Sequence, residues 1–198
     1  MSNSHKVLGN HSHGLLFVVS APAGTGKTTL VEKLTQEFPC VVRSISSTTR
    51  PKRPTETNGV DYCFLTDDEF AKKVAEGQFL EHVTLFGYQY GTSKCQVEKQ
   101  RAEGKHVVLV IDTQGALHLM GQLAATFIFI LPPSFEELAR RLQERGTENY
   151  DSLAKRLHEA EREIATSTAY QYVIVNDEIQ TAYEVLKSII IAEEHRIR

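Results

Sequence analysis

The sequence predicts an α/β fold built on a central parallel sheet, and two patterns carry that prediction. Apolar runs of strand length recur without alternating polar residues, which is typical of strands covered on both faces of a parallel sheet. Helical patterns separate these runs, and strand alternating with helix favours right-handed crossovers within one sheet. The expected strands are Leu15–Val19, His106–Ile111, Thr126–Leu131 and Tyr172–Val175.

Helices are expected between and after these strands. One spans Thr28–Phe38 and follows a glycine-rich loop. Another spans Ser134–Glu144 and begins after two prolines, with Ser134 as its N-cap. Two more are indicated by apolar faces at helical spacing. Those faces are formed by Leu153, Leu157, Ala160 and Ile164, and by Ile179, Ala182, Tyr183, Leu186, Ile189 and Ile190.

The segment from about Ser46 to Gln100 breaks this alternation. It contains only one clear helix, Asp67–Glu76, among short aromatic-rich runs that are closely spaced, which favours a small β-rich insert. The runs are Tyr62–Leu65, Phe79–Leu85 and Tyr88–Gly91. A second irregular stretch, Glu144–Ser152, joins two helices, and we expect a mobile lid there.

Composition limits the classes of function. The chain has 198 residues, which suits one domain, and its net charge of −3 lacks the basic surplus expected for a nucleic acid polymer or an anionic membrane as partner. A single nucleotide needs only a few local cations. No apolar run approaches the roughly 20 residues of a membrane span. Three distant cysteines, Cys40, Cys63 and Cys95, indicate a reduced, cytoplasmic protein without a disulfide framework.

The first 13 residues are polar and rich in small side chains, so we expect a flexible N-terminal tail at 1–13. His5, His11 and His13 lie in this segment. We interpret them as solvated residues of the tail rather than as ligands of a metal ion.

The stretch from Ala21 to Thr28, APAGTGKT, nearly fits the phosphate-loop pattern and lies between an apolar strand and a helix, which is the context that motif requires. Its backbone N–H groups and the helix N-terminus would cradle phosphates. Lys27 would neutralise the transferring phosphate, and the Thr28 hydroxyl would bind Mg²⁺. The predicted phosphate-binding residues of the loop are Ala21, Pro22, Ala23, Gly24, Thr25, Gly26, Lys27, Thr28 and Thr29.

Ala21 replaces the first glycine of the pattern. A methyl group is tolerated where φ is negative and costly where φ is positive. Pro22 biases its predecessor toward extended backbone. We therefore predict that Ala21 has a negative φ and that the loop is intact.

The insert carries residues suited to a second nucleotide. Arg50 and Arg53 are three apart and Tyr62 follows; arginine forks match phosphate oxygens and a phenol adds a hydrogen bond. Glu81 would accept from the ring N–H and the amine of guanine, a pair that adenine does not present. A hydroxyl of Ser46 or Thr92 would donate to the guanine carbonyl.

Five stretches together resemble the motif set of the guanylate kinase family, in order, across about residues 14–195. They are ISSTTRPKRPTETNGVDYCF, FLEHVTLFGYQYGTS, VIDTQGA, RLQERGTE and VIVND. The resemblance implies a P-loop kinase fold: a central parallel sheet flanked by helices, a β-rich insert that binds the nucleoside monophosphate, and a helical lid. It implies phosphorylation of GMP, and of dGMP, with ATP and Mg²⁺, by a monomer or homodimer.

The resemblance also implies roles and boundaries. GMP would be held by Ser46, Arg50, Arg53, Tyr62, Glu81, Tyr90, Thr92 and Asp112, of which Arg50, Arg53, Tyr62 and Tyr90 would bind the phosphate. Arg141, Arg145 and Arg156 would act with Lys27 in catalysis, and Asn176 would lie near the adenine. The implied domain covers 14–198, with a core at 14–45 and 101–198, the insert at about 46–100 and the lid at about 141–156. Val110 departs from the family, which usually has an acid there that helps organise Mg²⁺.

Two other interpretations stay open at this point. One is a kinase for a different small acceptor, such as AMP, a pyrimidine nucleotide or shikimate, against which Glu81 and Asp112 argue. The other is a noncatalytic guanylate-kinase-like module that binds phosphopeptides through the same arginines. The intact Gly24, Gly26, Lys27 and Thr28 favour the enzyme.

Overall fold

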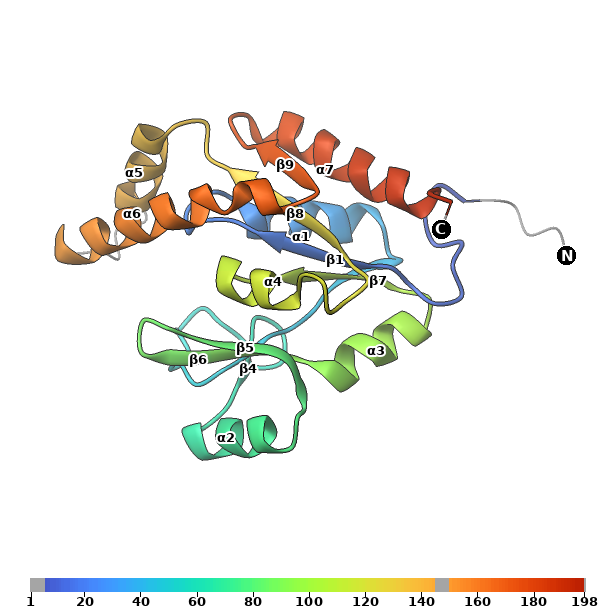
Figure 1. The fold of residues 1–198 in the computed structure, drawn as a ribbon, viewed down its shortest axis with the longest axis horizontal. Helices are drawn as coiled ribbons and strands as arrows, with labels where there is room; N and C mark the ends of the chain where they lie inside the picture. Colours follow the sequence, from blue (N-terminus) through green and yellow to red (C-terminus); the bar gives the residue numbers. More distant parts are fainter. Residues whose placement is uncertain (1–5, 145–149, 198) are drawn as a thin grey trace, which may run out of the picture.

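The centre of the fold is a parallel sheet (Figure 1). The structure is a computed structural model that describes residues 6–144 and 150–197. Within those ranges the sheet has five strands in the order β2-β7-β1-β8-β9, and every neighbouring pair runs parallel. The strands are β1 (Leu16–Ser20), β2 (Val41–Arg43), β7 (His106–Val110), β8 (Thr126–Leu131) and β9 (Tyr172–Val175). The predicted fold class is confirmed. β8 and β9 have the predicted bounds, β1 and β7 differ from theirs by one residue, and β2 was not predicted.

Helices cover both faces of this sheet. On one face α1 (Lys27–Glu37) and α7 (Ile179–Glu194) pack on Phe17, Ile128 and their neighbours. On the other face α3 (Lys94–Ala102) and α4 (Thr113–Leu119) pack on Val18, Leu109 and their neighbours. The continuous apolar character of β1 and β7 follows from this burial on both sides.

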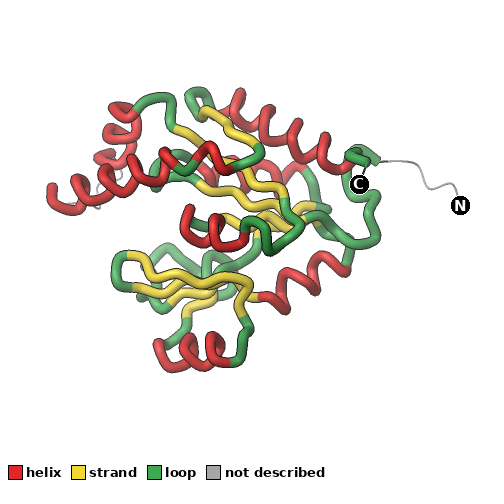
Figure 2. The backbone as a smooth tube through the Cα atoms, in the orientation of Figure 1, coloured by secondary structure: helices red, strands yellow, loops and turns green. Residues whose placement is uncertain are grey.

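The insert forms a second, smaller sheet beside the core (Figure 2). Its strand order is β4-β3-β6-β5, with β5 and β6 paired as an antiparallel hairpin. The elements are β3 (Ser47–Thr48), β4 (Cys63–Phe64), α2 (Asp67–Ala75), β5 (Phe79–Leu85) and β6 (Tyr88–Ser93). Thr66 and Glu69 begin α2 with a reciprocal capping box. The expectation that this segment has one clear helix is wrong, because α3 starts directly after β6. Ser93 caps α3 and only Val97 of that helix is buried, which leaves no apolar periodicity to detect.

An arm of two helices extends from one end of the sheet. It consists of α5 (Phe135–Glu144) and α6 (Tyr150–Ala165), joined through Leu138, Leu142 and Ala160. The predicted N-cap is confirmed, because Ser134 Oγ accepts from the N–H of Glu137 at 3.1 Å. Residues 150–152 are helical rather than irregular, and the rest of the predicted lid loop, 145–149, lies outside the described residues. A 3₁₀ turn, η1 (Ser167–Ala169), leads into β9. No helix within the described ranges is long and apolar enough to cross a membrane.

Residues 6–13, part of the predicted flexible tail, are mostly exposed but contact the end of α7 through Leu8, Asn10 and His11. Leu8 is buried. The N–H of Asn10 donates to Glu194 Oε1 at 2.6 Å, and Nε2 of His11 lies 2.9 Å from the Glu194 carbonyl oxygen. Glu194 Oε2 also lies 2.7 Å from Nε2 of the buried His106. A buried carboxylate thus ties the N-terminal segment to the core.

Candidate active site

The loop between β1 and α1 has the backbone of a phosphate loop. Gly24 and Gly26 have φ values of 89° and 88°, the left-handed region that glycine adopts without strain. Among the described non-glycine residues, only Phe86 has a positive φ. The prediction for Ala21 is therefore confirmed: it does not have positive φ, and its methyl group is buried in the core.

Two side-chain hydrogen bonds, one within the loop and one from the end of β9, hold this loop in shape. Nζ of Lys27 donates to the Ala21 carbonyl at 3.0 Å, which folds the ammonium back over the loop. Nδ2 of Asn176 donates to the Thr25 carbonyl at 2.6 Å and fills the space that a side chain on Gly26 would need. Asn176, which was matched to an adenine-side position, is buried and supports the loop. Thr28 is exposed in the first turn of α1.

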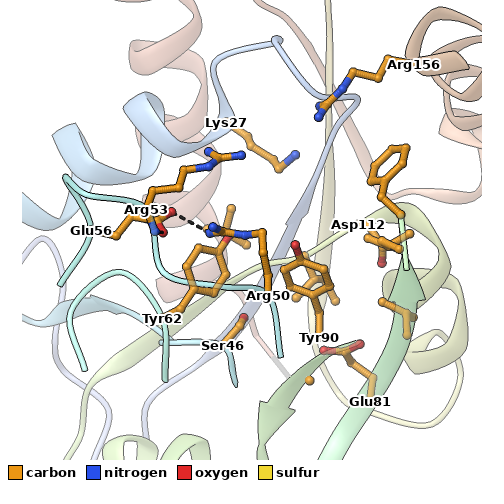
Figure 3. A pocket seen from close by; sticks show the side chains of 16 residues that line it. Lys27, Ser46, Arg50, Arg53, Glu56, Tyr62, Glu81, Tyr90, Asp112 and Arg156 are labelled. Carbon is orange, nitrogen blue, oxygen red and sulfur yellow. Dashed lines mark hydrogen bonds and ion pairs between the residues drawn. The ribbon is translucent and has the colours of Figure 1, made fainter. Parts of the chain in front are cut away.

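Two adjoining cavities of about 250 and 330 Å³ meet beside this loop. Lys27, Asp112 and Arg156 line both of them. The first cavity extends into the insert and is shown in Figure 3. Its wall includes the predicted acceptor residues Ser46, Arg50, Arg53, Tyr62, Glu81, Tyr90 and Asp112. The second extends along the loop and α6, past Ala21, Ala23, Glu159 and Glu163. The structure therefore brings most of the predicted acceptor residues into one cavity next to Lys27.

One end of the first cavity is basic and aromatic. Nη2 of Arg50 lies 2.6 Å from Glu56 Oε1 (Figure 3). The backbone N–H of Arg53 donates to Glu56 Oε2 at 2.9 Å. The Arg50 guanidinium lies 5.4 Å from the ring centroid of Tyr62. Burial raises the pKa of Tyr62, so its hydroxyl stays a donor at neutral pH. This end can bind a phosphate group that replaces Glu56 as the partner of Arg50.

The other end of the first cavity holds two carboxylates. Thr92 Oγ1 donates to Glu81 Oε1 at 2.6 Å, and the N–H of Gly115 donates to Asp112 Oδ1 at 2.8 Å. Burial raises the pKa of Glu81 to about 7 and also raises the pKa of Asp112. Asp112 Oδ2 is buried without a hydrogen-bond partner among the described residues. Two acceptor groups at this end suit a ligand edge that presents N–H donors.

Of the two hydroxyls expected to read the base, only Ser46 lines the cavity. Thr92 is buried behind Glu81 and its proton is engaged on that carboxylate. In this arrangement Thr92 orients Glu81, and Ser46 is the hydroxyl available to a ligand.

The predicted catalytic arginines take different positions. Arg156, on α6, reaches both cavities. Arg141, on α5, donates to Glu137 Oε1 at 2.7 Å and to the Asn176 carbonyl at 3.0 Å and lines neither cavity. Arg145 lies outside the described residues. Within the described residues, Arg156 is thus the member of this group that can reach a ligand directly.

Sequence reasoning missed several residues of the site. Glu56 lies three residues after Arg53, and in the sequence this charge pattern looks the same for a site residue as for a solvated surface residue. Glu163 accepts from Thr113 Oγ1 at 3.4 Å, and burial raises its pKa to about 7. Phe86 lines both cavities. The Phe-Gly pair between two strand-like runs is the sequence feature that could have identified it.

The residues present fit a magnesium ion only in part. Mg²⁺ takes oxygen ligands and keeps several waters, with substrate phosphates completing its shell. The protein offers the exposed Thr28 hydroxyl, whereas Val110 presents an apolar side chain to the first cavity. Within the described part of the chain, no cluster of three His, Cys, Asp or Glu side chains suits a metal ion. The donor set therefore fits Mg²⁺ brought with nucleotide phosphates rather than a resident metal.

Comparison with known proteins gives consistent results. A family model described as Guanylate kinase matches residues 14–193. A guanylate kinase of Protochlamydia amoebophila is 57% identical over 189 residues, which cover 96% of this chain and 96% of that protein. A guanylate kinase of Chlamydia felis is 50% identical over 182 residues, covering 91% of this chain and 89% of that protein. The crystal structure of guanylate kinase from Anaplasma phagocytophilum has a TM-score of 0.77 and 35% identity, and the match covers 93% of this chain and 88% of that one.

Proposed function

The chain belongs to the guanylate kinase family, and on that premise we propose that it transfers the γ-phosphoryl group of ATP to GMP. The products are ADP and GDP. The observation that carries the proposal is the first cavity, which places the carboxylates of Glu81 and Asp112 at one end and Arg50 and Arg53 at the other, with Lys27 beside them. We include dGMP as an acceptor, because the proposed contacts use only the base and the phosphate.

GMP occupies the first cavity in this proposal. Glu81 accepts from the N1–H and the amine of guanine, and Asp112 accepts from the same edge. Ser46 donates to the guanine carbonyl. Arg50, Arg53, Tyr62 and Tyr90 bind the phosphate, and Glu56 leaves Arg50 as the phosphate arrives. Adenine would leave the buried carboxylates without donors, which is a stronger basis for rejection than shape alone.

ATP occupies the second cavity and the loop. The backbone N–H groups of the loop and the N-terminus of α1 bind the phosphates, with Lys27 alongside. The Thr28 hydroxyl would hold Mg²⁺, which supplies neutralisation of the phosphate charge when it is bound with ATP. Thr29, Asn176, Arg141 and Arg145 stay predictions as ATP-side residues.

The reaction is a direct in-line transfer. A phosphate oxygen of GMP forms a bond to the γ-phosphorus of ATP, and the bond from that phosphorus to the β–γ bridging oxygen breaks, with its electron pair going to ADP. The attacking oxygen is already ionised near neutral pH, so no general base is needed. Lys27 and Arg156 line both cavities and would offset the charge on the transferring group.

The test is ADP formation from ATP in the presence and absence of GMP, in a coupled assay. We expect GMP-dependent ADP formation that Lys27→Met abolishes while GMP binding, measured by calorimetry, is largely kept. Substantial turnover by Lys27→Met would contradict the role of Lys27. Absence of GMP-dependent turnover in the wild-type protein would contradict the proposal and favour a noncatalytic module. A cytoplasmic location and a monomeric or homodimeric state stay predictions.

A further inference from the structure

The turn between β5 and β6 contains a strained aromatic residue. Phe86 and Gly87 join the two strands, and their φ values are 52° and 82°. Two positive φ values in a two-residue hairpin are typical of a type I′ turn, which prefers Asn-Gly because asparagine tolerates this region better than other side chains. A bulky residue with positive φ is an outlier that persists where the surrounding structure or a function maintains it.

Burial does not explain the phenylalanine. Phe86 is 63% exposed, which is more than the other exposed aromatic residues in the described part of the chain. An asparagine at this position would relieve strain and remove an exposed apolar surface. Turn geometry and solvation therefore both favour a residue other than the one present.

The ring of Phe86 instead contacts the arm. The guanidinium carbon of Arg156 lies 5.1 Å from the ring centroid, within the range of a cation–π interaction. Both residues line both cavities, although Phe86 comes from the insert and Arg156 from α6. Figure 3 shows Arg156 reaching toward the first cavity from the side opposite Glu81. The contact thus lies where the two proposed nucleotide sites meet.

We propose that Phe86 is a positioning residue that holds the Arg156 guanidinium at the junction of the two cavities. This inference rests on the proposed function, since the position matters only if a phosphoryl group passes through the junction. Fixing an arginine side chain costs conformational entropy, because the side chain loses rotamer freedom. Contact with the Phe86 ring restricts Arg156 before the substrates bind, so less entropy is lost during turnover. The strain of the turn is retained because only an aromatic ring at its tip supplies that contact.

The main test is Phe86→Asn, compared with Phe86→Leu and Phe86→Tyr. Asparagine suits the turn, so we expect Phe86→Asn to melt at the same temperature as the wild-type protein or higher. We expect its kcat to fall by about 3- to 30-fold, the range that corresponds to loss of a cation–π contact. KM for GMP should change by less than about twofold, because Arg156 is not among the proposed GMP-binding residues. Phe86→Leu should show the same fall in kcat, and Phe86→Tyr should recover most of it.

A matched control and a double-mutant cycle complete the test. Val60 is 59% exposed in the same insert and lines neither cavity, so Val60→Asn makes a comparable surface change away from Arg156. It should leave kcat unchanged. In an Arg156→Met background, measured under single-turnover conditions, Phe86→Asn should have no further effect on the rate, because the effect acts through Arg156.

Several outcomes would overturn the inference. They are a wild-type kcat for Phe86→Asn, a Phe86→Tyr variant as slow as Phe86→Asn, or an equal fall in rate with and without Arg156. A wild-type protein that does not phosphorylate GMP would overturn this inference and the proposed function together. Wild-type turnover with an unaffected Phe86→Asn would overturn this inference alone.

Discussion

Thr92 donates a 2.6 Å hydrogen bond to Glu81 across the paired strands β5 and β6, and both side chains are buried. The second oxygen of Glu81 faces the core domain, where a Cβ atom on Gly115 would lie 2.6 Å from it. The same Cβ would lie 3.1 Å from Oδ1 of Asp112. The proposed guanine-reading end therefore depends on a glycine of α4 that lets two carboxylates from different parts of the chain come close together.

Gly115→Ala tests this close approach. The added methyl group would displace Glu81 or Asp112, so we expect GMP affinity to fall by about tenfold or more. The free energy of unfolding should change by less than about 1 kcal/mol, because the preference of a helix for alanine, roughly 0.5–1 kcal/mol, is offset by displacement of a buried carboxylate. Calorimetry with GMP and a thermal melt measure the two effects. His118→Ala on the exposed side of the same helix is the control, and equal GMP affinity in all three proteins would contradict the proposed role of this contact.

Glu81→Gln tests the ionisation of the base-reading carboxylate. The pKa of Glu81 is raised by burial from 4.5 to about 7, so between these values the folded protein keeps a proton that the unfolded chain has released. The free energy of unfolding then falls as pH rises through this window. At pH 8 we expect Glu81→Gln to be more stable than the wild type by about 2 kcal/mol, with the difference vanishing near pH 4. Urea melts at both pH values measure the difference in the free energy of unfolding. A less stable Glu81→Gln at pH 8 would show that burial does not disfavour the ionised form of Glu81.

The same carboxylate predicts how GMP binding depends on pH. Guanine needs an acceptor at both oxygens, so wild-type affinity for GMP should decrease as pH falls below about 7. Glu81→Gln should bind GMP about 100-fold more weakly at pH 8, because an amide replaces one acceptor with a donor in a buried site. Titrations of GMP across pH 5.5 to 8.5 check both statements, and a flat wild-type profile would count against ionised Glu81 as the base reader.

Ala21→Gly tests whether the departure from the loop pattern matters. Ala21 does not have positive φ and its methyl group is buried, so glycine removes packing without relieving strain. We expect a loss of about 1–2 kcal/mol in the free energy of unfolding. The kcat should stay within about twofold, since the loop backbone is already in place. A large gain in kcat would mean that alanine distorts the loop.

Val110→Asp tests the second departure. A carboxylate here would add an oxygen near Asp112 at the wall of the first cavity and help organise Mg²⁺ and its waters. We expect the variant to reach half-maximal activity at a lower Mg²⁺ concentration than the wild type. Val110→Asn, which adds a polar group without charge, is the matched control. An unchanged Mg²⁺ titration would show that the missing acid is inconsequential.

The sequence was sufficient for β1, β7 and β8 because these strands are apolar and buried on both faces. Shorter elements could not be predicted from the sequence, for physical reasons. The strand β2 has three residues, and β3 has two, which is too short for a periodic pattern to appear. The helix α4 has seven residues and starts at Asp112, whose side chain caps it by accepting from Gly115. The same carboxylate thus begins a helix and lines the site, and only the fold shows both.

In the candidate site, too, some positions could be predicted from the sequence and others depend on the fold. Arg50, Arg53, Tyr62, Glu81 and Asp112 were predicted from motifs and lie in one cavity. Thr92 and Asn176, which stay predictions as nucleotide-binding residues, line neither cavity and hydrogen-bond to Glu81 and to the loop. Local sequence cannot separate a residue that touches a ligand from one that holds its neighbour, because that difference depends on which side of a strand or loop faces the cavity.

A coupled assay of ADP production with GMP, dGMP and AMP at saturating ATP tests whether the protein is a kinase selective for guanine nucleotides. We predict turnover of GMP and dGMP, and a kcat/KM for AMP that is lower by at least about 1000-fold, because adenine leaves the buried carboxylates of Glu81 and Asp112 unpaired. AMP turning over as well as GMP, or no ADP formation that depends on GMP, would contradict this prediction.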